Sequence, residues 1–145
     1  MTYNEFMNRP KRLHKRIMHE ADDVAFKLEV CQKTTGTIGE RVQTSTNNVT
    51  EIHYAAYIDA NNKLKELLND YKNAKNEVMD FLYDNLGYED ADILEWRYVN
   101  DKTLQDTAKL LGIAYQTARN RMSKAESRAR AKYLEVGTHR DSKVQ

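Results

Sequence analysis

The side chains best suited to chemistry lie between Tyr115 and Arg130, where amides and guanidinium groups recur at helical spacing. Gln116 and Asn120 are four residues apart, and each amide can make a pair of hydrogen bonds to an adenine base edge. Arg119 can make the equivalent pair to guanine. Further basic residues follow at Arg121, Lys124, Arg128 and Arg130. The stretch therefore predicts contact with nucleic acid, and the alternative is a solvated polar helix face.

The segment before Tyr115 has the residues required for two short helices joined by a tight turn. Thr103 is typical of a helix N-cap, and Asp106 completes a variant of the capping box. Ala108 supplies a small residue where the first helix crosses the second, and Gly112 tolerates the positive φ of a turn. The predicted apolar core of this pair is completed by Leu110 or Leu111, Ile113, Ala118, Met122 and Ala125.

Three helices are predicted in this last third of the chain. The first covers 91–99, and residues 100–102 form a turn. The second begins after Thr103 and ends at Leu111, where Gly112 closes it. The third begins near Tyr115 and continues to about Leu134.

This string resembles region four of bacterial sigma factors over about 45 residues. The positions in register with that signature are Leu94, Arg97, Tyr98, Thr103, Leu104, Ala108, Leu111, Gly112, Ile113, Arg119, Arg121 and Ala125. The chain departs from it at Thr107, Ala114 and Ala118, where isoleucine, serine and valine are usual. The resemblance implies a helix-turn-helix that binds double-stranded DNA.

The resemblance also implies which residues face the DNA. The major groove would be contacted by Tyr115, Gln116, Arg119, Asn120 and Ser123. Phosphate contacts, which position a protein without reading sequence, suit Thr103, Gln105, Arg121, Lys124 and Arg128.

Two long helices are predicted ahead of this module. In the first, Leu13, Ile17, Val24, Leu28 and Cys31 follow the period of a helical seam. Pro10 suits its first turn, and Thr2 with Glu5 suits a capping box for a short preceding turn.

The second long helix is expected from about Asn48, as N-cap, to Asn85. Its apolar residues repeat by four and three from Tyr57 to Leu82, and Gly87 is predicted to end it in the left-handed conformation. Between the long helices, residues 34–50 contain two Gly and six Thr without an apolar period, which predicts a flexible linker.

Composition agrees with an all-α fold. Charged residues make up 31% of the chain, and its 145 residues include only five Gly and one Pro. The net charge of +1 is unevenly distributed, with +2 over 1–49, −7 over 50–96 and +6 over 97–145. A basic end on an acidic body favours binding to a polyanion.

Other classes of function lack their residue patterns. The four His have no neighbouring Cys or carboxylate pattern of a metal site, and there is no phosphate-binding loop or nucleophile elbow. We therefore expect no enzyme, no metal and no cofactor. No signal peptide or membrane span is expected, so the sequence predicts a protein of a reducing compartment, and the single Cys31 is predicted to be a buried thiol.

The whole chain resembles phage and prophage late-gene regulators of the RinA/ArpU kind. That resemblance implies a helical scaffold or dimerisation region over 1–87 ahead of a DNA-binding domain over 88–136, in the cytoplasm of a bacterial host. The remaining residues, 137–145, are predicted to be a disordered tail. The leading hypothesis is a sequence-specific transcription regulator, with homodimerisation through the seam from Tyr57 to Leu82. The alternative is a protein-interaction module that binds RNA polymerase, a repressor or another host or phage protein.

Overall fold

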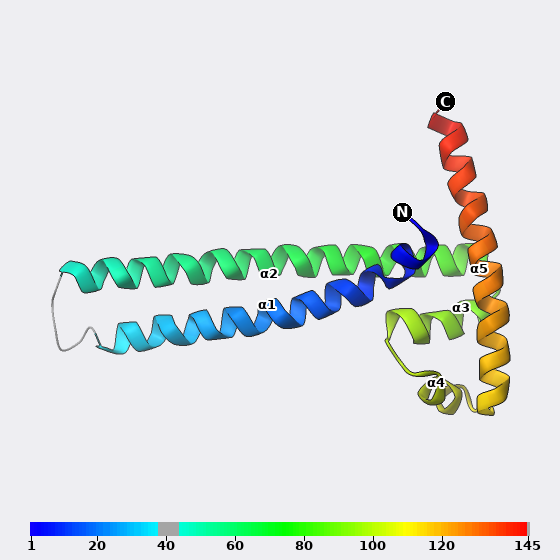
Figure 1. Cartoon of the computed structure of the whole chain (residues 1–145), viewed down its shortest axis with the longest axis horizontal. Helices are drawn as coiled ribbons and strands as arrows, with labels where there is room; N and C mark the ends of the chain where they lie inside the picture. The colour runs from blue at the N-terminus through cyan, green and yellow to red at the C-terminus, as the bar shows by residue number, and fades with distance from the viewer. Residues whose placement is uncertain (38–43, 145) are drawn as a thin grey trace. The chain divides into compact units, whose positions relative to one another are not determined.

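The structure is a computed structural model that describes the backbone of residues 1–37 and 44–144 and the side chains of residues 1–33 and 49–137. Apart from residues 1–2 and the short connections at 86–87, 100–103 and 112–114, these residues are helical, and they contain no strand. The elements are α1 (Tyr3–Thr37), α2 (Thr44–Asn85), α3 (Tyr88–Leu94), the π-helical turn η2 (Glu95–Val99), α4 (Leu104–Leu111) and α5 (Tyr115–Val144) (Figure 1). The prediction of an all-α fold with long N-terminal helices is confirmed.

Helix α1 starts earlier than the sequence predicted. The amide of Glu5 donates to the Thr2 hydroxyl at 3.2 Å, and the amide of Thr2 donates to the Glu5 carboxylate at 3.1 Å. This capping box was predicted for a short separate turn, but it begins the long helix itself. Pro10 consequently lies inside α1 and is buried, so its predicted first-turn position is wrong. A proline there costs one backbone hydrogen bond, and burial of its ring offsets part of that cost.

Helix α2 ends at Asn85 as predicted, but two details differ. It begins at Thr44 rather than near Asn48. Gly87 has φ −65° and ψ 157°, so it is extended and not left-handed. It precedes α3 as the N-cap, and its carbonyl accepts the amide of Ala91 at 2.9 Å. The side chain of Asn85 donates to the Phe81 carbonyl at 2.9 Å, so α2 ends without a left-handed glycine.

The segment before α4 also differs from the prediction in one respect. The predicted helix over 91–99 begins at Tyr88 and widens into η2, where the amide of Asn100 donates to the Glu95 carbonyl at 3.0 Å. Asp101 then has a φ of 52°, and Arg97 Nη1 donates to the Lys102 carbonyl at 2.6 Å. These contacts fix the turn that leads to Thr103.

The chain divides into two compact units, Met1–Arg12 with Lys72–Gln145, and Leu13–Tyr71. The predicted scaffold over 1–87 and DNA-binding domain over 88–136 are divisions by function and stay predictions. The flexible linker predicted near 34–50 is wrong at both of its ends, because residues 34–37 continue α1 and residues 44–50 belong to α2. Its middle, residues 38–43, lies outside the described backbone. Helix α5 extends to Val144, so its predicted end at about Leu134 is wrong. Within the predicted tail over 137–145, only the exposure of Gly137 is described.

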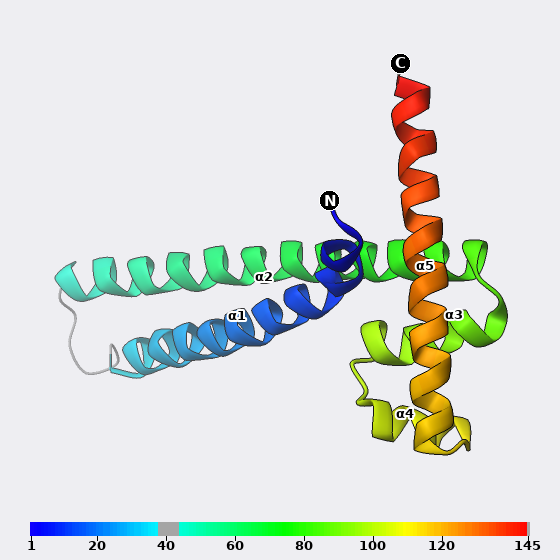
Figure 2. The same cartoon turned by 45° about the vertical axis from the view of Figure 1, so that its right-hand side comes forward.

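The unit Leu13–Tyr71 is an antiparallel pair formed by parts of α1 and α2. Lys63 Nζ lies 3.6 Å from a Glu20 carboxylate oxygen, and the rings of His14 and Tyr71 are 5.8 Å apart. Later residues of one helix therefore meet earlier residues of the other, and the two run side by side in both views (Figure 1 and Figure 2). Residues buried here include Val24, Cys31, Ala60 and Leu67, which confirms the predicted burial of Cys31.

The unit Met1–Arg12 with Lys72–Gln145 has a denser core. It combines the first turns of α1, the end of α2 and the helices α3 and α5. Its fully buried side chains include Met7, Leu82, Ile93 and Leu94. The N-terminal residues thus help to hold α5, which carries most of the predicted functional residues.

Candidate nucleic-acid interface

Two helices and a short turn form the predicted site. The hydroxyl of Thr103 accepts the amide of Asp106 at 3.1 Å and begins α4. Gly112 ends α4 with φ 68° and ψ 32°, a left-handed conformation that glycine adopts without steric cost. The amide of Ile113 then donates to the Ala108 carbonyl at 3.0 Å, and α5 begins at Tyr115. These helix boundaries agree with the sequence prediction.

The packing of α4 on α5 requires small residues. Ala108 on α4 and Ala118 on α5 are both buried, and Thr107 is buried beside Ala108. Thr107 fits because its hydroxyl donates to the Thr103 carbonyl at 2.8 Å, so no polar group is left unsatisfied. A threonine in place of the usual isoleucine is therefore compatible with this core.

The first half of α5 has a buried face and an opposite exposed face. Ala118, Ala125 and Ala129 are buried and Met122 is half-buried, with spacings of four, three and four residues. At about 100° per residue, Gln116, Asn120 and Ser123 fall on the opposite side of the helix, with Arg119 at one edge. All four are exposed, and Tyr115 is 52% exposed.

The five predicted base-contacting residues are therefore accessible from solvent. Gln116 Nε2 lies 3.5 Å from Asn120 Oδ1, so these amides are neighbours and can present their hydrogen-bonding groups together. Tyr115 also lines a shallow hollow of about 450 Å³ with Thr103, Leu104 and Gln105. That hollow brings one predicted base contact close to two predicted phosphate contacts.

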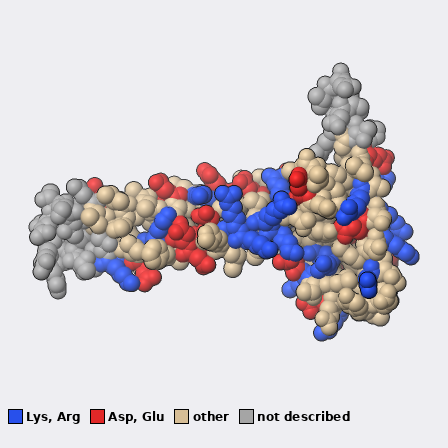
Figure 3. Space-filling model, in the orientation of Figure 1, with Lys and Arg blue, Asp and Glu red and all other residues tan. Residues whose placement is uncertain are grey.

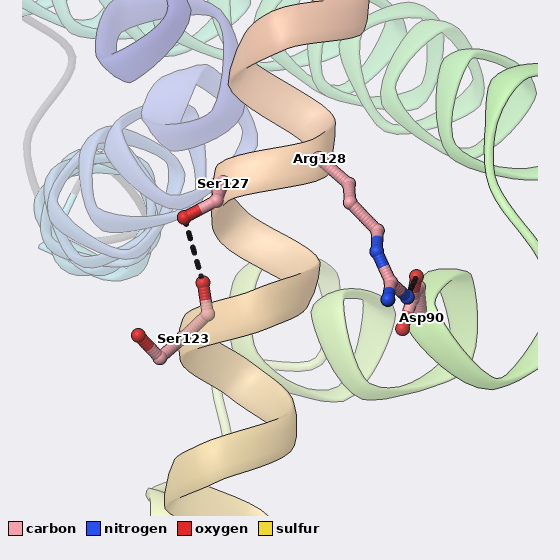
Figure 4. Close-up of polar contacts among 4 residues, drawn as sticks. All are labelled: Asp90, Ser123, Ser127 and Arg128. Carbon is pink, nitrogen blue, oxygen red and sulfur yellow. Dashed lines mark hydrogen bonds and ion pairs between the residues drawn. The ribbon is translucent and has the colours of Figure 1, made fainter.

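The predicted phosphate contacts on α5 form a separate stripe. Arg121, Lys124 and Arg128 are spaced by three and four residues, and all are exposed. Within the described residues, Arg121 and Lys124 have no ion-pair partner, whereas Arg128 Nη1 lies 2.7 Å from a carboxylate oxygen of Asp90 (Figure 4). Arg128 thus already has a structural role, and Asp90 was missed because the two are 38 positions apart.

One buried and one half-buried tyrosine, Tyr3 and Tyr98, position the middle of α5. The Tyr3 hydroxyl donates to Glu126 Oε1 at 3.3 Å, and the Tyr98 hydroxyl donates to the same oxygen. Burial, followed by the Glu126 charge, raises the pKa of Tyr3. Burial, followed by the hydrogen bond to Glu126, raises the pKa of Tyr98, so both hydroxyls remain donors. Arg130 lies over the Tyr3 ring, 5.3 Å from its centroid. Like Arg128, Arg130 therefore already makes a contact within the protein.

A second basic surface was not singled out from the sequence. Lys and Arg gather over the first half of α1 (Figure 3). In the unit Leu13–Tyr71, Lys15, Arg16 and His19 are spaced by one and three residues, which places them on one face, and all are exposed. Leu13 and Ile17 lie on the other side of the helix and are half-buried. The amphipathic spacing was the signal that could have identified this face.

Among the described residues, no group of three or more His, Cys, Asp or Glu side chains is placed to hold a metal ion. Within that part of the chain, no helix is long and apolar enough to cross a membrane. No family model, no curated protein and no solved structure matched the chain in comparisons with known proteins.

Proposed function

We propose that the chain is a sequence-specific DNA-binding transcription regulator, in which α4 and α5 form a helix-turn-helix and α5 is the recognition helix. The observation that carries the proposal is the exposed polar face of α5 opposite Ala118, Ala125 and Ala129. An α-helix fits the major groove, where each base pair presents a distinct pattern of donors and acceptors. Amide and guanidinium groups on the first turns of such a helix match that pattern.

Within this proposal, Gln116, Arg119 and Asn120 read base edges, and Tyr115 and Ser123 contact the flanks of the same groove. The stripe of Arg121 and Lys124 contacts phosphates on one side. Thr103 and Gln105 contact phosphates beside the start of α4, where the helix dipole favours negative charge. Arg128 contributes less than Arg121 because its guanidinium is already paired with Asp90 at 2.7 Å.

The type of regulator rests on the resemblances alone. The likeness of residues 94–125 to sigma factor region four supports promoter or operator DNA as the target. The likeness to phage late-gene regulators supports a role as an activator. Dimerisation through α2 would let two recognition helices read half-sites one helical turn of DNA apart, about 34–36 Å, or multiples of that.

The test starts with selection of bound fragments from the genome of the source, followed by titration of the selected duplex and a random duplex. Replacing Arg119 or Asn120 by Ala should weaken binding to the selected duplex by about 1–3 kcal/mol and relax the choice of base. Replacing Lys124 by Ala should weaken both duplexes alike and reduce the salt slope by about one. Lys65→Ala, an exposed lysine on α2, is the control and should change neither.

Two outcomes would contradict the proposal. Equal loss on both duplexes for Arg119→Ala, Asn120→Ala and Lys124→Ala would mean that α5 does not read bases. Absence of salt-dependent retention on any duplex would favour the alternative, in which the module binds a protein and not DNA.

A further inference from the structure

A groove of about 660 Å³ lies in the unit Met1–Arg12 with Lys72–Gln145, away from the predicted recognition residues. It is bounded by the start of α1, the end of α2 and the second half of α5. Its lining includes three aromatic rings and three carboxylates, together with Met1, Asn85 and Val136. No lysine or arginine is among its lining residues in the described part of the chain.

The aromatic wall consists of Phe6, Phe81 and Tyr133. The Phe6 and Tyr133 rings have centroids 5.3 Å apart, and Phe81 lies 5.5 Å from Phe6 and 5.8 Å from Tyr133. The Tyr133 hydroxyl donates to the Met1 carbonyl at 2.9 Å, which fixes the orientation of its ring. The wall is therefore a preorganised apolar surface whose ring faces attract cations.

The carboxylates Glu77, Asp80 and Asp84 follow one another along α2. Their spacing by three and four residues separates them by about 4.5 and 6 Å along the helix axis. Glu77 is shared with Arg9, whose Nη1 lies 3.4 Å away. Asp80 and Asp84 are exposed and have no ion-pair partner within the described residues. Two carboxylates that have no ion-pair partner among the described residues thus lie beside an apolar wall.

We propose that this groove binds a basic segment of a partner protein, with arginine or lysine head groups on Asp80 and Asp84 and their aliphatic stems against the aromatic wall. Long basic side chains have both parts, because their stems are apolar and their ends charged. Charge complementarity with the carboxylates requires a positively charged partner. The row of carboxylates extends about 10 Å along α2, which fits successive basic residues of a chain better than one small cation.

The position of the groove leaves the predicted DNA-binding residues free. Tyr133 is fourteen residues beyond Arg119 on α5, which corresponds to about 21 Å along the helix. Because of this separation, a partner can bind in the groove while the protein is also bound to DNA.

The test uses ¹⁵N chemical shifts of the full-length protein and defined probes. The first probe is a synthetic helical peptide with arginines at i, i+3 and i+7 and leucines between them, and the second replaces its arginines by glutamates. The third probe is spermidine, a small cation. We expect the arginine peptide to shift the amide signals around Phe81 and Tyr133 and the glutamate peptide to leave them unchanged.

Variants establish which charges act. Asp80→Asn with Asp84→Asn should weaken binding of the arginine peptide by about tenfold and reduce its dependence on salt. Asp70→Asn, which removes an exposed α2 carboxylate outside the groove, is the matched control and should leave binding unchanged. Circular dichroism should show that each variant is as helical as the parent.

Three results would overturn the proposal. The first is the absence of shifts around the groove, and the second is equal weakening by Asp70→Asn, which would mean unspecific attraction. The third is saturation by spermidine as tight as by the peptide, which would assign the groove to small cations. None of these results depends on whether the protein retains duplex DNA, so failure here and failure of the proposed DNA binding are distinguishable.

Discussion

The two units of the chain bury their apolar side chains to different degrees. In Met1–Arg12 with Lys72–Gln145, the core side chains of Met7 and Leu94 have no exposed surface. In Leu13–Tyr71, Phe26 is 63% and Ile52 is 65% exposed, although both are large and apolar. Burial of apolar area is the main favourable term in folding, so the first unit has the better conditions for a stable fold. Both units also leave large apolar side chains exposed, among them Leu110 in the first and Phe26 in the second.

The largest expected effect follows from deletion of residues 1–12. This removes Tyr3 and Met7 from the core and the Tyr3 hydrogen bond to Glu126. We expect this deletion to remove more free energy than the unit has to spare, because the free energy of unfolding of a small domain is only about 5–15 kcal/mol. Urea unfolding followed by near-ultraviolet circular dichroism should show no cooperative transition for the unit that contains α5. If the truncated chain unfolds at the same urea concentration as the parent, residues 1–12 do not contribute to the stability of this unit.

A second, smaller effect compares equivalent substitutions in the two units. Leu94→Ala should reduce the free energy of unfolding by about 3–5 kcal/mol, because Leu94 is fully buried in a dense core. Leu67→Ala should cost about 2 kcal/mol, at the low end of the range, because a thinner core collapses more easily into the cavity. Chemical denaturation measures both values. Equal costs would mean that the two units are packed equally well.

A third effect concerns the exposed apolar residues of Leu13–Tyr71. If the proposed dimer forms through the seam from Tyr57 to Leu82, Leu68→Glu should shift the protein to monomer at micromolar concentration, because Leu68 is an exposed apolar residue within that seam. The reason is the cost of burying a carboxylate in an interface without a partner. Light scattering across a dilution series measures the mass. Ala55→Glu is the comparison variant, because Ala55 is exposed on α2 outside the seam. If this variant is also monomeric, the interface extends to Ala55. A parent chain that is monomeric throughout the series would rule out this interface.

The sequence predicted those parts of the structure that depend on local chemistry. Thr103, Gly112 and Tyr115 bound α4 and α5 as expected, because caps and left-handed turns depend on a few adjacent residues. The positions of Pro10 and Gly87 within their helices were predicted wrongly, because local sequence allows each residue more than one role. Proline can stand in the first turn or inside a helix, and glycine can end one helix or precede the next, and packing against neighbouring helices determines which role is adopted.

Long-range packing was the part that the sequence did not predict. Tyr3 meets Glu126 across 123 positions, and Tyr133 reaches Met1 across 132. Neither pair has a local pattern, because both depend on how the start of α1 packs beside α5. The exposure of the candidate recognition residues followed from helical periodicity, whereas the aromatic and acidic groove required three separate segments to be placed together.

The smallest expected effect is a pH-dependent change in stability when one carboxylate, Asp92 in the first unit, is replaced by an amide, and it is compared with the same replacement of Asp70 in the second. Burial, followed by the charge of Glu95, raises the pKa of Asp92 above its ordinary value. The folded state therefore holds the Asp92 proton more tightly than the unfolded state, and ionisation of this group lowers stability at neutral pH. That cost disappears as the pH falls below the ordinary range of aspartate, about 3.9. Asp92→Asn should consequently raise the urea midpoint at about pH 7 and have no effect on it at about pH 3. Asp70→Asn, at an exposed position of the other unit, is the control and should leave the midpoint unchanged at both values. A midpoint lowered by Asp92→Asn at neutral pH would mean that the charged form of Asp92 has a favourable partner in the folded protein, and that burial is not the dominant influence on this carboxylate.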